Sequence, residues 1–405
     1  MSYEVRPCAS AEELRDAVRP ISHYFGRSTP NAEQIDRVGR VLPVDRAHAA
    51  WDGSHVVGGA SSFPFLLTVP GGRVGAAGIS AVGVLPTHRR RGILRALMRA
   101  QLDDCRRRGE VVAYLWASED TLYGRFGYGL ASLSGEIELA REHTAYHPGA
   151  GASAEARLIA LDEAEALIAP VYERLAACTP GMFARTPAWW QARVLDDPEW
   201  RRAGGGQLQC AVLDLGAGPA AYALYRVNFG SDRGVPTGAI DVIEAMGDSP
   251  ESTAAIWRYL LDMDWTSRVK ARFLPLDHPL FLLLAEPRRL RFSVRDGLWV
   301  RLVDVGAALT ARSYQAGEPV VVEVADPFCP WNEGRWRLCA TGAERTQSAA
   351  ELRCDVTALG SVYLGGFTWS QLARALRVDA PAPSAITRAD ALFRTTIAPW
   401  CPEMF

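Results

Sequence analysis

One run of predicted elements occurs twice along the chain, and this repeat constrains the fold more than any other feature of the sequence. Residues 48–69 predict a β-hairpin, because Asp52-Gly53 stands between two apolar runs. Residues 75–105 predict a strand followed by an amphipathic helix. Residues 209–229 and 238–263 repeat this order. We therefore predict an α+β fold with two related domains, each a mixed sheet flanked by helices.

The remainder of the chain follows another pattern, which indicates a third domain. A chain of 405 residues is too long for one hydrophobic core. After Pro287, strand-like runs and one stretch of helical spacing predict a sheet with at least one helix against it. We place the domains at residues 1–150, 151–288 and 289–405. The last residues, "PWCPEMF", are mostly aromatic and apolar, so we expect the C-terminus to be docked on the protein.

Composition and charge argue against several classes of function. The net charge of −2 gives no reason to expect nucleic acid as a partner. The start of the chain lacks the apolar core of a signal peptide, and the longest dense apolar run, residues 279–285, is too short to span a membrane. The eight cysteines form no C-x-x-C pair, and there is no H-E-x-x-H motif. We expect a cytoplasmic protein with reduced thiols and no metal.

Three arginines, Arg89 to Arg91, and Gly92 stand directly before the first amphipathic helix. Each cation costs about 0.3–1 kcal/mol at an exposed helix start, which weakens the alternative of a plain solvated helix end. A bound anion would remove this cost, because free N–H groups attract it, glycine lets a phosphate approach, and arginines neutralise its charge. We therefore favour a phosphate site here. The second copy has "DSPEST" at this place, so we expect no anion site there.

The elements around this motif resemble the acetyl-CoA-binding core of the GNAT acetyltransferase superfamily. Arg89-x-x-Gly92 is similar to its pyrophosphate loop, although Leu94 departs from the last motif position, and the similarity covers roughly residues 45–135. The whole chain resembles the Eis (enhanced intracellular survival) family. That resemblance implies two GNAT-like domains, the second degenerate, then a sterol-carrier-protein-like domain, assembled as a homohexamer. It also implies acetyl-CoA as co-substrate and amines of aminoglycosides or lysine side chains as acceptors.

The resemblance suggests which residues bind the cofactor. Backbone N–H groups of the glycine-interrupted strand would hydrogen-bond it and polarise its thioester. The helix start would hold the pyrophosphate. Ser118 would contact the cofactor arm, and capping of the following helix is an equal alternative. The predicted cofactor contacts are Val82, Val84, Arg89, Arg90, Gly92, Ile93 and Ser118.

The resemblance also assigns the proton-transfer groups. Tyr123, in "LYGRFGYG", would be the general acid that protonates the leaving thiolate, and its ordinary pKa of about 10 suits that role. We expect the competing Tyr128 to be a core residue and His88 a loop residue. The α-carboxylate of Phe405 would be the general base, directly or through water, although its intrinsic pKa of about 3.3–3.7 is low. Alternatively, Phe405 and Trp400 only anchor the terminus.

The acceptor pocket is the least determined part of the prediction. An amine acceptor needs carboxylates and aromatic faces, and our candidates are Glu403, Trp200 and Asp36, with Trp189 behind them. Each has an ordinary surface or core role as its alternative. Two other functions stay open: an N-acetyltransferase that acts mainly on protein lysines or polyamines, and a non-catalytic carrier whose third domain binds a lipid.

Overall fold

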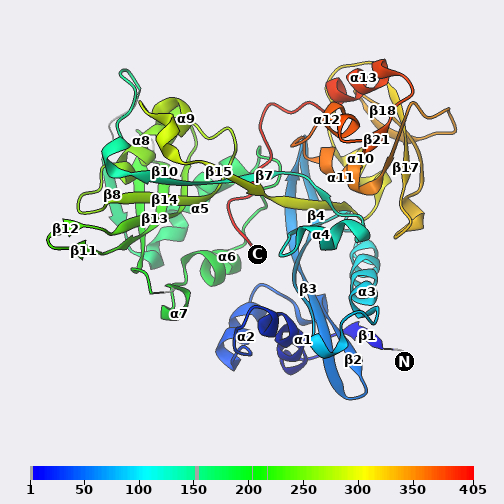
Figure 1. Ribbon diagram of the computed structural model, residues 1–405, viewed down its shortest axis with the longest axis horizontal. Coiled ribbons are helices and arrows are strands. Elements are labelled where there is room, and N and C mark those ends of the chain that lie inside the picture. The colour runs from blue at the N-terminus through cyan, green and yellow to red at the C-terminus, as the bar shows by residue number, and fades with distance from the viewer. Residues whose placement is uncertain (1–2, 151–154, 203, 217) are drawn as a thin grey trace.

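The computed structural model describes residues 3–150, 155–202, 204–216 and 218–405. Two seven-stranded sheets, a five-stranded sheet and a small ribbon make up its β-structure (Figure 1). The first sheet has the order β1 (Glu4–Pro7), β2 (Ala47–Asp52), β3 (His55–Val69), β4 (Gly72–Val84), β5 (Val112–Trp116), β16 (Leu298–Leu302) and β6 (Gly129–Leu130). The second has the order β15 (Ser293–Asp296), β7 (Leu133–Ala140), β14 (Arg268–Leu274), β13 (Ala239–Gly247), β10 (Pro219–Asn228), β9 (Leu208–Asp214) and β8 (Ala156–Ile159).

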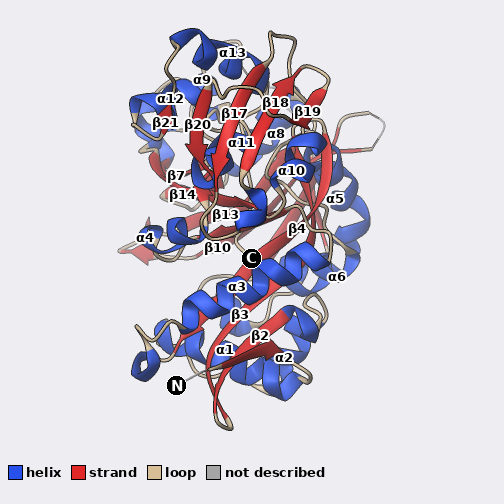
Figure 2. Ribbon diagram, turned by 90° about the vertical axis from the view of Figure 1, so that its right-hand side faces the viewer, coloured by secondary structure: helices blue, strands red, loops and turns tan. Residues whose placement is uncertain are grey.

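The third sheet and the helices complete the fold (Figure 2). The third sheet has the order β19 (Gly342–Arg345), β18 (Gly334–Cys339), β17 (Val320–Ala325), β20 (Leu352–Asp355) and β21 (Val378–Asp379), and the ribbon joins β11 (Ser231–Asp232) to β12 (Val235–Pro236). The helices are α1 (Ala11–Tyr24), α2 (Ala32–Gly39), α3 (Ile93–Arg107), α4 (Asp120–Tyr123), α5 (Leu161–Ala176), α6 (Pro187–Trp189), α7 (Glu199–Arg202), α8 (Pro250–Leu261), α9 (Leu280–Leu283), α10 (Val305–Ala311), α11 (Val356–Tyr363), α12 (Trp369–Arg374) and α13 (Pro383–Phe393).

The predicted repeat and the predicted α+β class are confirmed. The two large sheets have the same pattern of strand pairing, with one parallel pair among antiparallel pairs. The parallel pair is β4–β5 in the first sheet and β13–β14 in the second. Each parallel pair is connected through a helix, α3 or α8, as a crossover connection requires.

The two large sheets exchange strands, which the sequence pattern did not indicate. Strand β7 leaves the first domain and pairs with β14 and β15 in the second sheet. Strand β16, which follows the second domain in the chain, enters the first sheet between β5 and β6. The domain boundaries at residues 150 and 288 remain predictions. Strands on either side of each boundary pair with one another in the sheets. The first sheet is complete only after the chain has returned from the second domain.

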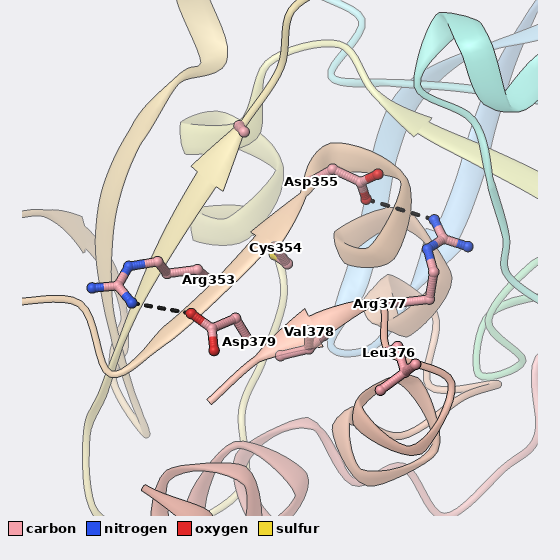
Figure 3. A pocket seen from close by; sticks show the side chains of 8 residues that line it. Arg353, Cys354, Asp355, Leu376, Arg377, Val378 and Asp379 are labelled. Atoms are coloured by element: carbon pink, nitrogen blue, oxygen red, sulfur yellow. Dashed lines mark hydrogen bonds and ion pairs between the residues drawn. The ribbon is translucent and has the colours of Figure 1, made fainter. Parts of the chain in front are cut away.

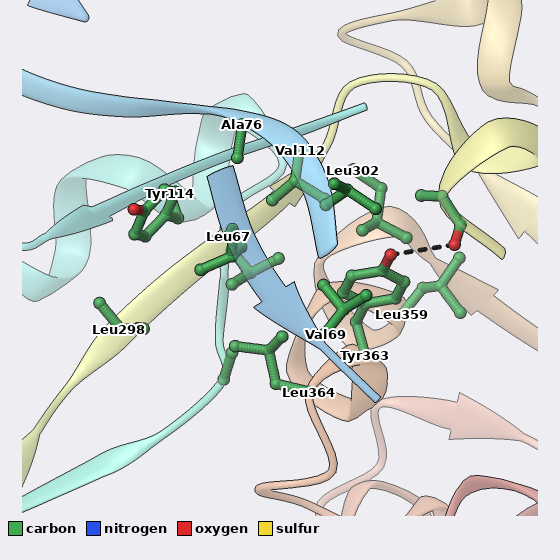
Figure 4. Close-up of a cluster of buried hydrophobic side chains, with 14 of the residues drawn as sticks. Leu67, Val69, Ala76, Val112, Tyr114, Leu298, Leu302, Leu359, Tyr363 and Leu364 are labelled. Carbon is green, nitrogen blue, oxygen red and sulfur yellow. Dashed lines mark hydrogen bonds between the residues drawn. The ribbon is translucent and has the colours of Figure 1, made fainter. Parts of the chain in front are cut away.

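The third domain packs against the first through a shared core. Every residue of α11 is buried, and the helix lies against β16 and β6. Leu67, Leu298 and Leu359 belong to the same apolar cluster, drawn in Figure 4. Gly129 permits this close approach, since a Cβ there would stand 1.8 Å from the Thr357 carbonyl oxygen. The first sheet and the third domain therefore form one continuous core.

A buried ion pair also joins these two domains. Arg301 of β16 donates to Asp326 at 2.6 Å, and both side chains are fully buried. We expect Asp326→Ala to lower the free energy of unfolding by about 3–5 kcal/mol, because it leaves an uncompensated buried guanidinium. Denaturant unfolding would measure this loss. Glu323→Ala, which breaks half-exposed pairs with Arg335 and Arg353, is the control and should cost about 1 kcal/mol or less. Equal losses for the two variants would contradict the prediction.

Candidate active site

The first sheet opens between its two parallel strands. Strands β4 and β5 pair only from Ala76–Val112 to Gly78–Tyr114. Beyond that point β4 carries a bulge, seen as a register shift against β3 and as a left-handed residue, Ala81, with φ of 52°. The bulge bends β4 away from β5, so the backbone groups that would have paired with β5 face an open space.

Backbone N–H groups of β4 point into this opening. Leu85 donates its N–H to the Val57 carbonyl on β3, at 2.8 Å. Since successive N–H groups of a strand point to opposite sides, the Val84 N–H faces away from β3, and Val82, two residues earlier, shares that direction. Both positions were predicted cofactor contacts, and both present a donor to a ligand that enters between β4 and β5.

The loop before α3 has the geometry of an anion site. Arg90 and Gly92 adopt left-handed φ values of 61° and 81°, which turns successive N–H groups toward one side. Helix α3 begins at Ile93 without a side-chain cap, so its first N–H groups stay available. Ile93 itself is 2% exposed, so only its backbone can reach a ligand. Nothing lies within 4 Å of the place where Gly92 would carry a Cβ, which leaves room for a phosphate.

The arginines of this loop carry free charge. Arg89 and Arg90 are exposed, and neither forms an ion pair with a carboxylate in the part of the chain that the structure describes. The Arg89 guanidinium lies 5.4 Å from the centre of the Tyr24 ring. His88 instead contacts the Asp52 carboxylate through Nε2 at 3.2 Å, which agrees with its predicted role as a loop residue.

Tyr123 belongs to the apolar cluster on one face of the first sheet. It is 4% exposed and shares an apolar cluster with Ile79 of β4 and Leu115 of β5. Burial raises the pKa of Tyr123 to about 12, and the Ser118 hydroxyl acts in the opposite direction. Ser118 does not cap α4, whose first turn has no side-chain cap, so the capping alternative for Ser118 is not what the structure shows. The raised pKa favours the protonated phenol at neutral pH, in a cluster that contains residues of both β4 and β5.

Tyr128 is a core residue, as its position in the motif predicted. It is fully buried and stacks edge-on against Tyr123, with 5.9 Å between ring centres. Burial raises the pKa of Tyr128 well above its ordinary value. Its hydroxyl has no hydrogen-bond partner among the described residues. Tyr128 thus supports the Tyr123 ring from behind and has no route to a ligand.

Phe405 lies on the opposite face of the same opening. Its ring packs between Phe65 and Tyr114, at 5.1 and 4.9 Å between ring centres, and its carboxylate accepts a hydrogen bond from the Ser80 hydroxyl at 3.0 Å. Ser80 immediately precedes the bulge of β4. Side chains alternate between the two faces of a sheet, so Ser80 faces away from Ile79, whose apolar cluster also contains Tyr123. The Tyr123 phenol and the terminal carboxylate therefore flank the opening from two sides.

Three contacts hold the chain terminus in this place, near the middle of the molecule (Figure 1). The Glu403 carboxylate accepts hydrogen bonds from Arg185 at 2.6 Å and from the Trp189 indole at 3.0 Å. The Trp116 indole at the end of β5 donates to the Glu403 carbonyl at 2.9 Å. Arg185 is itself buried and pairs with Glu244 of the second sheet. Glu403 was a candidate acceptor contact, and its charge is used inside the protein.

The other two acceptor candidates lie apart from this cluster. Trp200 is 57% exposed, with the Arg37 guanidinium 5.2 Å from its ring centre. Asp36 is exposed on α2 and forms no ion pair or side-chain hydrogen bond with any residue that the structure describes. Arg37 ties α2 to the segment after α6 through Asp196 at 2.8 Å. Their role in acceptor binding stays a prediction.

Comparison with known proteins bears on the whole chain. Residues 4–131 and 181–302 match two families that are each described as an acetyltransferase (GNAT) domain, and residues 305–402 match the sterol carrier protein domain family. The chain is 43% identical over 390 residues to an N-acetyltransferase of Streptomyces avermitilis, which covers 94% of each protein. It is 36% identical over 374 residues to the N-acetyltransferase Eis of Mycobacterium tuberculosis, covering 88% of this chain and 89% of that one. The chain belongs to the Eis family of GNAT N-acetyltransferases.

The crystal structure of Eis1 from Mycobacterium abscessus has the same overall fold, with a TM-score of 0.86 and 36% identity over 99% of this chain and 100% of that one. Membership in the Eis family confirms the predicted three-domain organisation and the predicted N-acetyltransferase activity. GNAT membership implies acetyl-CoA as co-substrate. The first domain fits this molecule, because its β4–β5 opening presents backbone donors and the start of α3 is uncapped and preceded by arginines.

Other features of this Eis-family chain lie away from the opening. Among the described residues there is no group of three potential metal ligands and no helix long and apolar enough to cross a membrane. A hollow of about 600 Å³ lies on the third domain, lined by Arg353, Asp355, Arg377 and Asp379 (Figure 3). Its charges face one another, with Arg353–Asp379 at 3.1 Å and Arg377–Asp355 at 3.7 Å.

Three site residues escaped sequence analysis: Ser80, Trp116 and Arg185. Ser80 had a usable signal, since it is the only hydroxyl-bearing residue between Arg73 and Thr87 in a run of glycine and apolar residues. Trp116 and Arg185 had none, because their importance comes from contacts with Glu403, more than 200 positions away in the chain.

Proposed function

We propose that this protein transfers the acetyl group of acetyl-CoA to amines of aminoglycosides, of lysine side chains or of both. The observation that carries the proposal is the placement of the Phe405 carboxylate beside the β4–β5 opening, bound by Ser80 and opposite Tyr123. Acetyl-CoA supplies the activated thioester. The residues that we expect to bind acetyl-CoA are those predicted from the sequence: the N–H groups at Val82 and Val84, the loop of Arg89, Arg90 and Gly92, the start of α3 at Ile93, and Ser118.

The chain's own groups divide the proton transfers between two faces of the sheet. The Phe405 carboxylate takes a proton from the acceptor ammonium, directly or through water, on the face of Ser80. Backbone N–H groups of the bulged β4 hold the thioester carbonyl, where one preorganised donor contributes about 10²–10³ in rate. Tyr123 gives its proton to the departing sulfur on the other face. Because burial raises the pKa of Tyr123 to about 12, the protonated acid and the deprotonated base exist together at neutral pH.

An amine acceptor fits the side chains near the terminus. The ring faces of Phe63 and Trp189 already hold a guanidinium, that of Arg193, at 5.7 and 5.2 Å from their centres. These ring faces therefore suit a cation, and an acceptor ammonium would compete with Arg193 for them. The exposed carboxylate of Asp36 and the ring of Trp200 are the further candidates. The family resemblance also carries the expectation of a homohexamer, which light scattering on the purified protein would test.

Thiol release from acetyl-CoA in the presence of aminoglycosides, polyamines or lysine peptides tests the proposed function. We expect turnover with aminoglycosides or lysine peptides and acetylated products by mass spectrometry. The chain contains one lysine, Lys270, so self-acetylation adds little background to the assay. Turnover with polyamines alone would overturn the acceptor class, and acetyl-CoA binding without any turnover would favour a carrier.

The anion site at the start of α3 makes a separate prediction. We expect Arg89→Glu to weaken acetyl-CoA binding about 10- to 100-fold, because it removes one charge-assisted contact to the pyrophosphate and adds a like charge. Isothermal titration would measure the dissociation constant. Arg40→Glu, at an exposed arginine just after α2, is the matched control and should leave binding unchanged. An unaltered dissociation constant in Arg89→Glu would remove the pyrophosphate from this loop.

A further inference from the structure

The second sheet opens between its parallel strands at the place that corresponds to the cofactor opening of the first. Strands β13 and β14 pair from Ala239–Arg268 to Val242–Ala271 and then separate. A register shift against β10 follows directly in β13, and Phe273 of β14 adopts a left-handed φ of 56°. Bulge and separation therefore occur in both domains in the same order along equivalent strands.

This second opening is filled by the C-terminal segment. The Trp400 indole enters it and donates its N–H to the Phe273 carbonyl at 2.5 Å, and Pro402 lines the same space. About 20 Å³ of free volume remains, room for about one water molecule and too little for the arm of a cofactor. An indole N–H thus occupies the strand edge where, in the first domain, a ligand would meet the backbone.

The helix after β13 gives independent evidence that no cofactor enters here. Ser249 and Ser252 form a capping box at the start of α8, in which the Ser249 hydroxyl accepts from the Ser252 N–H and the Ser252 hydroxyl accepts from the Ser249 N–H. Pro250, the first residue of the helix, has no N–H at all. The corresponding helix α3 is uncapped and has arginines before it. This agrees with the sequence prediction of no anion site in the second copy. The opening of the second domain is therefore filled by side chains of the protein itself.

The two openings face each other across the tail. The rings of Trp116, at the lip of the first opening, and Phe273, at the lip of the second, are 5.1 Å apart. The tail connects the two openings, because its Trp400 is held by the second sheet and its Phe405 by the first. The backbone of Trp400 is fixed as well, because its N–H donates to the Pro180 carbonyl at 2.8 Å.

We propose that the second domain acts as a socket for Trp400 and thereby positions the Phe405 carboxylate at the catalytic opening. Trp400 is a positioning residue, and the inference rests on the proposed role of that carboxylate. Four residues lie between Trp400 and Phe405. The contacts of Glu403 hold the tail from one side of this segment and the indole holds it from the other, so loss of the indole loosens the segment and shifts the carboxylate relative to the Ser80 hydroxyl. The acetyl-CoA site lies on other strand positions and keeps its affinity. The degenerate domain accordingly retains a catalytic purpose without binding a cofactor.

Full-length Trp400→Gly tests the socket. We expect kcat to fall at least about tenfold, because a displacement of about 1 Å in a reacting group can lower the rate by about 10²-fold. KM for acetyl-CoA should stay about unchanged. Trp265→Gly is the matched control, because this tryptophan is 64% exposed and its φ of 56° suits glycine. If Trp400→Gly does not fold, as judged by thermal melting, Trp400→Phe keeps the ring, loses the bond to Phe273 and should lower kcat less.

A double variant separates this inference from the proposed function. If Trp400 acts through the terminal carboxylate, adding Trp400→Gly to a form without Phe405 should lower kcat no further. Two effects that multiply, or an unchanged kcat in the folded single variants, would overturn the socket. Failure of the wild-type protein to acetylate any amine would instead overturn the proposed function.

Discussion

Removal of Phe405 is expected to lower kcat by about 10²–10⁴-fold, the usual contribution of a positioned general base. The carboxylate would then belong to Met404 and would no longer reach the Ser80 hydroxyl beside the bulge of β4. Residues added after Phe405 should have a similar effect, because they replace the carboxylate by a neutral amide. Steady-state kinetics with a saturating acceptor would measure kcat, and titration would show unchanged acetyl-CoA binding.

The control for this result is an extension of equal length at the N-terminus. It changes the mass and the tag of the protein and leaves the terminus of Phe405 free. Ser80→Ala provides a graded companion, since it removes one hydrogen bond to the carboxylate and keeps the charge. We expect it to lower kcat about tenfold, as loss of one bond to a charged group costs about 1.5 kcal/mol. Full activity in the C-terminally extended form would exclude the carboxylate from the mechanism.

Tyr123→Phe is expected to lower kcat and kcat/KM together by about 10²–10⁴-fold. The substitution keeps the ring in its cluster with Ile79 and Leu115 and removes only the proton donor. An interaction made only in the transition state affects both constants equally. Tyr128→Phe is the matched control: its hydroxyl is buried without a partner among the described residues, so its loss should leave kcat about unchanged.

The pH dependence gives a second readout for the same acid. Burial raises the pKa of Tyr123 to about 12, so the phenol stays protonated at neutral and moderately alkaline pH. The acid is lost only as pH rises through that raised value. The ordinary pKa of tyrosine is about 10. We therefore expect kcat/KM of the wild type not to fall as the pH rises through this value. A fall there that disappears in Tyr123→Phe would contradict a buried, fully protonated acid.

The anion site shows how far local sequence reasoning reaches. Arginines at a helix start are unfavourable by themselves, so their presence pointed to a bound anion. The structure adds the left-handed turn at Arg90 and Gly92 and the absence of a cap on α3, which are local features of the same few residues. Signals of this kind can be read from sequence because the physical cause and its effect lie within one turn of the chain.

The acceptor candidates show where such reasoning ends. The carboxylate of Glu403 makes it a candidate to hold a cation, and the cation that it holds is Arg185 of the protein itself. Nothing near either residue in the chain indicates this pair, which forms because the tail crosses from the third domain to the second sheet. Trp116 and Ser80 gain their roles in the same way, through contacts with a terminus that is distant in sequence.

The sequence by itself determined the repeated α+β domains, the cationic start of α3 that we propose as a phosphate site, and the docking of an apolar terminus. These follow from periodicity, turn chemistry and the helix dipole, which act over a few residues. Only the tertiary structure decided that β7 and β16 exchange sheets, that the opening of the second domain holds Trp400, and that Tyr123 and the Phe405 carboxylate flank one opening. Those outcomes depend on which buried surfaces meet across long loops, and that choice is made by the packing of the whole chain rather than by any segment of it.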